Sequence, residues 1–233
     1  MSYGKPRPTG RNRLLRACVL GAAALGLPAC SDDAGSGQIS GPNSERITLS
    51  VRVHLLSSDF APLNTTLTDD EVGVVFARVN EVWQQADITW DIESIVREEA
   101  LNADGFALVL AGQLPASTLN VASILPLGRL LSGQWDAFLI QDLGGIAGGF
   151  YFPDIPATLS AEIDPFGQRE LTGSAARILA HELGHSLSLA HVPCTPDGNL
   201  MAAGCDSQDR TRLTATQAQA ARQQARRGQP FGS

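Results

Sequence analysis

The sequence predicts an α+β fold in which a twisted, mostly parallel sheet is backed by a long helix. Apolar and polar residues alternate over residues 47–56, as they do in a half-buried strand. A helical repeat of apolar residues and a second strand, residues 88–96, come next, and this β-α-β order favours parallel strands with the helix packed on them. The apolar run Trp135–Leu143, which glycines bound on both sides, predicts a further buried strand.

Length and composition allow one folded domain, which we expect at residues 46–233. The chain has 233 residues, 43% of them hydrophobic, and this is enough for a single sizeable core. Its formal charge is −7, although the first 30 residues are basic and contain no acid. Nucleic-acid binding requires a basic surface, so this charge argues against a nucleic-acid partner. We expect the domain to be a monomer.

The segment 1–30 has the composition of a signal peptide. Residues 1–16 are basic and polar, and residues 17–29 form an uncharged apolar run that is too short to span a bilayer. The run ends in LPAC, which resembles a bacterial lipobox. This resemblance implies an exported protein that the lipidated Cys30 anchors to a membrane, facing the periplasm or the exterior, with no other membrane contact. The alternative is an ordinary secretory signal and a secreted protein.

A segment rich in Ser, Asp, Gly and Asn follows this leader. Residues 31–45 contain almost no apolar side chains and cannot bury enough surface to order themselves. We interpret them as a flexible tether, although a frayed N-terminus of the mature protein would have the same composition.

The long helix has a clear start. Thr68 is expected to cap it, and Glu71 occupies the position that completes a capping box. Residues 106–111, further along the chain, are compatible with either a strand or the start of a helix. Apolar residues recur at helical spacing to about Gln85 and are Val72, Val75, Phe76, Val79 and Val82.

Three of the four histidines of the chain lie in one short segment. His181 and His185 are four residues apart, so on a helix both rings project from one face and can bind one metal ion. Glu182 lies about 100° round the helix, where it can contact a water molecule on that metal without being a ligand. His191 can be a third ligand only if the helix ends near Ser188 and the chain turns back. Three histidines with an open fourth position are typical of a catalytic zinc site.

The segment His181–His191 resembles the HExxHxxGxxH signature of the metzincin metallopeptidases, with Ser188 at the usual glycine position. Glycine adopts positive φ more cheaply, so serine raises the cost of the turn. The family's second hallmark, a turn that contains methionine, is matched by residues 199–202 with Met201. The resemblance implies bound zinc and a peptidase activity with Glu182 as general base. The alternative is an ordinary amphipathic helix whose histidines are satisfied by hydrogen bonds.

A glycine-rich run, Gly145, Ile146, Ala147, Gly148 and Gly149, precedes the motif. Glycine weakens a strand and commonly marks a bulge or a close approach of another backbone. The run resembles the edge strand of metzincins, and of matrixins in particular. This resemblance implies an antiparallel edge strand along which an extended peptide pairs. An ordinary glycine-rich hairpin is the alternative.

Two helices complete the expected fold. The helix that carries the motif is expected to have Thr172 or Ser174 as its N-cap. A C-terminal helix, residues 213–227, is expected to be capped by Thr214 or Thr216. The motif helix has an apolar stripe for the core at Ala176, Leu179, Leu183 and Leu187.

Cys194 and Cys205 flank Met201, and in an exported protein we expect them to form a disulfide. Zinc ligation by these cysteines is the alternative. His54, the histidine outside the motif, falls on the polar side of the first strand and is interpreted as a solvated residue.

Together these patterns predict a zinc-dependent endopeptidase that acts on proteins or peptides. The alternative is a surface lipoprotein that binds zinc and a partner protein without turnover. Calcium is a further candidate ligand because several aspartates are expected on the surface, although none lies in a recognisable loop motif. These aspartates are Asp136, Asp142, Asp154 and Asp164.

Overall fold

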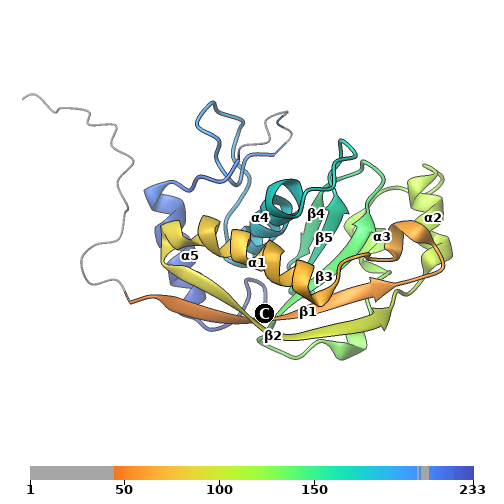
Figure 1. The fold of residues 1–233 in the computed structure, drawn as a ribbon, viewed down its shortest axis with the longest axis horizontal. Helices are drawn as coiled ribbons and strands as arrows, with labels where there is room; N and C mark the ends of the chain where they lie inside the picture. Colours follow the sequence, from red (N-terminus) through yellow and green to blue (C-terminus); the bar gives the residue numbers. More distant parts are fainter. Residues whose placement is uncertain (1–44, 204, 206–209) are drawn as a thin grey trace, which may run out of the picture. The chain divides into compact units, whose positions relative to one another are not determined.

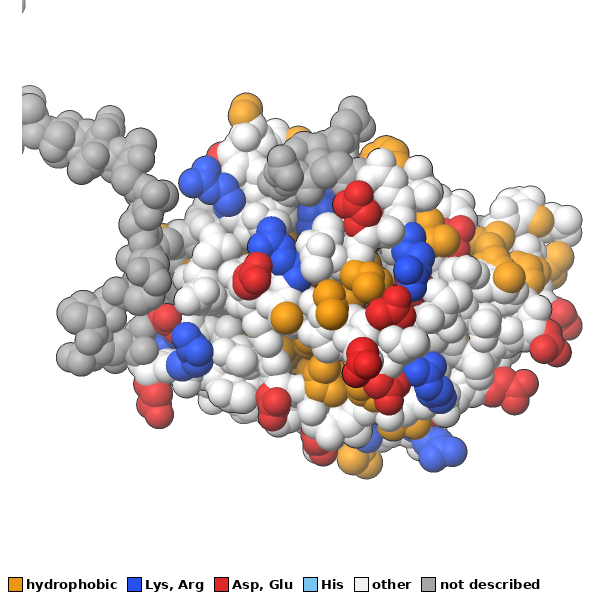
Figure 2. All heavy atoms as spheres, in the orientation of Figure 1, with side chains coloured by type: hydrophobic (Ala, Val, Ile, Leu, Met, Phe, Trp, Pro, Cys, Tyr) orange, Lys and Arg blue, Asp and Glu red, His pale blue; other side chains and the backbone are white. Residues whose placement is uncertain are grey.

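The computed structural model describes residues 45–203, 205 and 210–233 (Figure 1). The predictions for the signal peptide, for Cys30 and for residues 31–44 of the tether concern positions outside this part. No helix among the described residues is long and apolar enough to cross a membrane. On the face in Figure 2, the acidic and basic side chains of the described part are interspersed.

Five strands form one sheet. They are β1 (Ile47–Ser57), β2 (Ile88–Glu99), β3 (Trp135–Asp142), β4 (Gly149–Phe152) and β5 (Ala157–Ile163). Their order in the sheet is β2-β1-β3-β5-β4. Neighbours are parallel except for β4, which runs antiparallel to β5 at the edge. The predicted mostly parallel sheet with an antiparallel edge strand is therefore confirmed, but the sequence patterns above did not predict β5.

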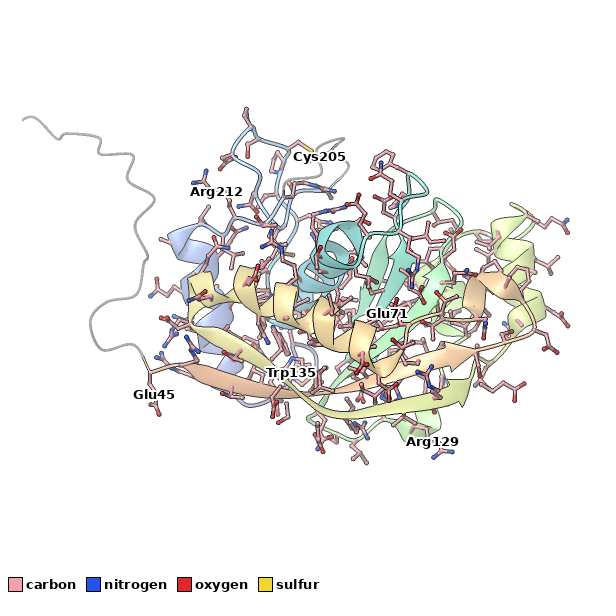
Figure 3. The ribbon with its side chains drawn as sticks, in the orientation of Figure 1. Glu45, Glu71, Arg129, Trp135, Cys205 and Arg212 are labelled. Carbon is pink, nitrogen blue, oxygen red and sulfur yellow. A yellow bond between two sulfur atoms is a disulfide. The ribbon has the colours of Figure 1, made fainter. Side chains whose placement is uncertain are left out.

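The long backing helix, α1 (Asp69–Trp83), begins as expected. The side chain of Thr68 accepts a hydrogen bond from the Glu71 N–H at 3.2 Å, and the Glu71 carboxylate accepts one from the Thr68 N–H at 2.8 Å. Figure 3 labels Glu71 at this end of the helix. Because the capping box satisfies two N–H groups that the helix leaves unpaired, it fixes where the helix starts.

Four further α-helices among the described residues include the ambiguous segment and the two helices that the sequence predicted. The ambiguous residues 106–111 belong to α2 (Ala103–Leu110), which α3 (Thr118–Ala122) follows. The motif lies on α4 (Ala176–Ser186), and the C-terminal helix is α5 (Ala215–Ala225), with Thr214 as its capping residue.

The start of α4 differs from the prediction. A π-helical turn, Leu171–Ala175, leads directly into α4, and its N-cap residue Ala175 is itself helical, with φ −62° and ψ −49°. Thr172 and Ser174 therefore do not cap the helix, and the Ser174 hydroxyl donates instead to the Gln168 carbonyl at 3.2 Å. A continuous helical turn leaves no extended N-cap position for either side chain to use.

Two apolar clusters lie on opposite faces of the sheet. One contains alternate residues of β1, such as Val51 and Val53, packed with α1, α4 and α5. The other contains Leu56 of β1 and Phe138 of β3, packed with α2 and α3. The apolar stripe predicted for α4 belongs to the first cluster, so the helix that carries the motif is also a core element.

His54 is buried and is not the solvated residue that strand alternation predicted. Its side chain lies on the face of β1 that the second cluster covers, and the residue is 2% exposed. One ring nitrogen contacts the Glu98 carboxylate, and Nε2 lies 2.8 Å from Oδ1 of Asp136. The ring also stacks on Phe138, with the ring centroids 4.3 Å apart. His54 is thus part of a buried charged network between three strands.

Candidate metal centre

The three histidines of the motif come together beside α4. Their Nε2 atoms lie 3.2 Å (His181 to His185), 3.1 Å (His181 to His191) and 2.9 Å (His185 to His191) apart. His181 and His185 project from α4, and His191 reaches them from the chain that follows it. Among the described residues, they are the group of three or more potential ligands whose donor atoms lie close enough together to hold a metal ion.

Backbone carbonyls orient two of the rings. Nδ1 of His181 lies 2.7 Å from the carbonyl oxygen of Leu200, and Nδ1 of His185 lies 2.7 Å from that of Leu189. A carbonyl only accepts hydrogen bonds, so each Nδ1 carries the proton and each Nε2 keeps its lone pair for a metal. Burial lowers the pKa of His181 to about 3 and also lowers the pKa of His185, so both rings are neutral at neutral pH.

This donor set fits zinc. Zinc–nitrogen bonds of about 2.0–2.1 Å in tetrahedral geometry need nitrogens roughly 3.3 Å apart, which is close to the separations of 2.9, 3.1 and 3.2 Å between the Nε2 atoms.

Cys194 and Cys205 form a disulfide, with 5.8 Å between their Cα atoms. The pairing that the sequence predicted is therefore present, and the alternative in which these cysteines bind zinc is wrong.

The turn that brings His191 back depends on Ser188. Ser188 has φ 67°, the left-handed conformation that glycine usually supplies. Its N–H donates to the His185 carbonyl at 2.9 Å, and the N–H of Leu189 donates to the Gly184 carbonyl at 3.0 Å. This pair of bonds is the Schellman motif, which ends helices through a left-handed residue. Serine therefore makes the turn that the motif requires.

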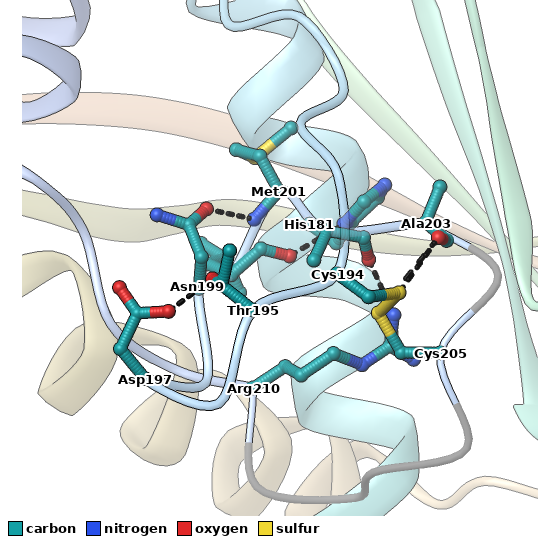
Figure 4. The surroundings of a disulfide bond; sticks show 11 residues. His181, Cys194, Thr195, Asp197, Asn199, Met201, Ala203, Cys205 and Arg210 are labelled. Carbon is teal, nitrogen blue, oxygen red and sulfur yellow. Dashed lines mark hydrogen bonds between the residues drawn. A yellow bond between two sulfur atoms is a disulfide. The ribbon is translucent and has the colours of Figure 1, made fainter. Parts of the chain in front are cut away.

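The Met201 turn lies beneath the histidines and is tied to them. Met201 is fully buried, and its N–H donates to the Asn199 side chain at 2.9 Å. Its carbonyl accepts from the N–H of Val192, the residue after His191, at 3.0 Å. Figure 4 shows the Cys194–Cys205 disulfide closing the loop that contains this turn. The turn thus supports His181 through the Leu200 carbonyl and His191 through its neighbour.

Glu182 is buried between α4 and the edge strand. It is 6% exposed, and burial raises the pKa of its carboxyl to about 8. A Cβ at position 149 would lie 2.6 Å from Cγ of Glu182, so only glycine at that position leaves room for the carboxyl group. Gly148 has the same relation to Ile178, whose side chain would lie 2.9 Å from a Cβ there. The glycines therefore allow the edge of the sheet to approach the helix closely.

The edge strand is displaced from the predicted glycine run. Of residues 145–149 only Gly149 belongs to β4, and the others form the loop before it. Phe150, Tyr151 and Phe152 make up the rest of β4, because aromatic side chains favour strands more than glycine does. The Gly148 carbonyl nevertheless accepts from the Ala161 N–H at 2.9 Å, which extends the contact with β5 by one residue.

Two hollows meet at Glu182. One, of about 470 Å³, lies beside His181 between residues 146–149, the start of α4 and the chain after Met201. The other, of about 570 Å³, lies beside His185 and extends along β4 toward Tyr151 and Phe231. Together they flank the three histidines on both sides.

Two arginines complete the surroundings of the hollow beside His181. Arg177 and Arg210 line the hollow beside His181, and the sequence analysis above did not identify them. Arg177 precedes His181 by one helical turn, and its charge on the same helix face as the first histidine was the sequence signal that could have identified it.

Two of the four aspartates considered for calcium, Asp136 and Asp164, are 3% and 1% exposed and are not surface residues.

The sheet, the motif helix with its returning third histidine, the buried methionine turn and the C-terminal helix define a metzincin-like fold. Among solved structures, mature mirolysin from Tannerella forsythia in complex with a cleaved peptide is similar over 80% of this chain and 96% of its own, with a TM-score of 0.56 and 13% identity. At this identity the likeness shows the fold alone. Metalloproteinase-II from Bacteroides fragilis matches over 81% of this chain and 54% of its own, with a TM-score of 0.44 and 13% identity. No protein-family model and no curated protein sequence matches the chain.

Proposed function

We propose that this protein is a zinc-dependent endopeptidase that hydrolyses peptide bonds of protein substrates. The observation that carries the proposal is the convergence of three imidazole nitrogens beside the buried carboxyl group of Glu182. His181, His185 and His191 would hold the ion. When bound, zinc supplies a Lewis acid that polarises the peptide carbonyl and lowers the pKa of a water molecule toward 7.

Glu182 would move the proton. Its carboxylate accepts the proton of the attacking water and returns it to the amine nitrogen that leaves. Both transfers need a carboxyl group whose pKa lies near the working pH. Burial raises the pKa of Glu182 to about 8 without metal, and a cation held by the three histidines would lower it, so with zinc bound this residue would be suited to accept and release a proton at neutral pH.

The edge strand would position the substrate. β4 is at the end of the sheet, so one side of its backbone is not paired within the sheet. An extended peptide can bind there through main-chain hydrogen bonds, with its side chains in the hollows at either side of Glu182. Binding of this kind accepts many sequences and suits an enzyme that cleaves within protein chains.

Zinc content and proteolysis test the proposal together. After zinc loading and dialysis, wild type should retain one zinc per chain and cleave casein or gelatin. Glu182→Ala should retain zinc but lose roughly 10²–10⁴-fold in cleavage rate. The matched control is Glu81→Ala, which removes an exposed carboxylate of α1 and should change neither property. Equal cleavage by wild type and Glu182→Ala would show that another group is the base.

We also propose that the protein acts outside the cytoplasm, held to a membrane by a lipid on Cys30, as a monomer without a nucleic-acid partner. The lipobox-like LPAC and the acidic body of the chain support this proposal. In bacterial cells, radiolabelled fatty acid should enter wild type and not Cys30→Ser. Wild-type protein that is soluble and carries no lipid would contradict the proposed membrane anchor at Cys30.

A further inference from the structure

The hollow beside His181 contains a buried cation, one of whose donors is unpaired. Arg177 is only 7% exposed, lines this hollow, and has no hydrogen-bond partner for its Nε atom. It lies on α4 one turn before His181, so its side chain is on the same face as the first histidine. A buried donor that lacks a hydrogen-bond partner is costly, so a ligand that accepts a hydrogen bond from Nε of Arg177 would offset this cost.

The electrostatics of the hollow favour an anion. Burial and, to a smaller extent, the nearby Arg210 lower the pKa of Arg177 to about 10, although Asp164 acts in the opposite direction. Arg177 therefore remains charged at neutral pH. The Asp164 carboxylate also accepts hydrogen bonds from the N–H groups of Phe166 and Gln168, both at 2.9 Å. The Asp164 carboxylate therefore interacts with backbone donors as well as with Arg177.

Arg210 adds a second guanidinium on the opposite wall. Figure 4 shows its side chain extending toward the Cys194–Cys205 disulfide, on the segment that follows Met201. It donates a hydrogen bond to the Ala202 carbonyl, which holds it against this wall. The hollow thus has a guanidinium on the α4 side and another on the side of the chain after Met201.

The direction of β4 tells which part of a peptide would enter this hollow. The hollow beside His181 borders Gly148 and Gly149, where β4 begins, and the other hollow extends toward Tyr151, near its end. A peptide that pairs antiparallel with β4, the more stable pairing, runs in the opposite direction. Its residues after the scissile bond therefore lie beside Arg177.

We infer that Arg177, assisted by Arg210, binds a carboxylate of the peptide on the leaving-group side of the scissile bond. This inference rests on the proposed function for the nature of the ligand. The carboxylate can belong to an Asp or Glu side chain or to the C-terminus of a short peptide. Arg177 is then a specificity-determining residue, and the enzyme prefers acidic substrates.

Binding to an inactive variant tests this without turnover. Zinc-loaded Glu182→Ala is titrated calorimetrically with acetylated, amidated alanine hexapeptides that carry Asp or Asn at one position each. A second arm compares acetyl-hexaalanine with a free carboxylate and with an amide. We expect roughly 10–100-fold tighter binding of the acid in at least one arm, because a charged hydrogen bond replaces a neutral one. The arm that shows the preference identifies the source of the carboxylate.

Variants of Arg177 assign the preference. Arg177→Met in the Glu182→Ala background should abolish it, and Arg177→Lys should retain part of it. Arg226→Met removes an exposed arginine from the end of α5 and should leave the preference unchanged. Arg177→Met removes a buried cation whose Nε is unpaired, so the substitution should not destabilise the protein. The urea midpoint of the variant should be equal to or higher than that of the Glu182→Ala parent.

The outcomes separate this inference from the proposed function. Acid preference that Arg177→Met abolishes supports the carboxylate site even if wild type cleaves no peptide, in which case the endopeptidase proposal fails alone. Equal binding of acid and amide peptides overturns the site even if wild type cleaves casein. A preference that survives Arg177→Met also overturns it. Where cleavage occurs, mass spectrometry of the products should place the carboxylate after the scissile bond.

Discussion

The sulfur of Met201 lies so close to Gly184 that a Cβ on residue 184 would be 2.6 Å from it. Gly184 is the fourth residue of the HELGH segment, so the helix that carries two histidines is packed directly on the methionine turn. The same turn supplies the Leu200 carbonyl that orients His181. Glycine at position 184 therefore sets the distance between the metal ligands and their support.

Gly184→Ala should reduce both stability and zinc affinity. The added methyl group must displace Met201 or α4, and overpacking of this kind costs roughly 1–3 kcal/mol in unfolding free energy. Urea unfolding and zinc titration check the expectation. Gly73→Ala is the control, because that position is in the middle of α1 with no atom within 4 Å of a Cβ. It should gain up to about 1 kcal/mol from helix propensity, and a similar gain for Gly184→Ala would contradict the packing argument.

Ser188→Gly should stabilise the protein without changing its zinc site. Ser188 adopts φ 67°, which costs a residue with a Cβ about 1 kcal/mol more than glycine. The hydrogen bonds of the turn use backbone atoms and are retained in the variant. Ser188→Ala keeps the Cβ and should show no gain in urea unfolding. Equal stability of the glycine and alanine variants would mean that the conformation at 188 carries no strain.

His54→Leu should be strongly destabilising while zinc binding is retained. The substitution leaves the buried Asp136 and the partly buried Glu98 carboxylates without the ring that joins them. Removal of one member of a buried charged group typically costs 3–5 kcal/mol. Because Asp136 keeps its ion pair with Arg52 at 2.6 Å, the double variant His54→Leu, Glu98→Gln tests whether the uncompensated charge of Glu98 is the cause. It should recover part of the loss in urea unfolding, and no recovery would point to packing instead.

The elements with a strong local signal were predictable from the sequence. The capping box at Thr68 and the helical spacing that follows it specify α1, and the spacing of His181, His185 and His191 specifies the site. The disulfide followed from the small number of cysteines in the chain. Each of these features depends on residues that are near one another in the sequence or on chemistry that few residue types supply.

The features that were missed depend on the second layer of the fold. Alternation placed His54 in solvent because one polar face is expected of a strand, but β1 is covered on both faces. β5 carries small and polar residues such as Ser160 and Glu162, which are buried at 1% exposure, so its composition gave no apolar run. The place of Arg177 in the hollow depends on the chain after Met201, which supplies part of the lining and is distant from Arg177 in the sequence. No local pattern contains these contacts.

Without metal, the stability of the protein should depend on pH through Glu182. Its pKa is about 8 in the folded protein and about 4.3 in an unfolded chain. Between these values the folded state binds a proton that the unfolded state has released, so the unfolding free energy falls as pH rises, by at most roughly 1.4 kcal/mol per unit. His181 and His185, whose pKa values are lowered, act in the opposite direction, because stability is lost as pH falls below about 6.5.

Glu182→Gln separates the two contributions. The variant keeps the histidines and the shape of the side chain but has no carboxyl group to titrate. In EDTA, the unfolding free energy of wild type minus that of the variant should therefore decline from about pH 4.3 and become constant near pH 8. Urea unfolding at intervals from pH 5 to pH 9 measures this difference. A difference that stays flat over this range would show that Glu182 is ionised in the folded, metal-free protein, and that it is not the buried neutral group that its position predicts.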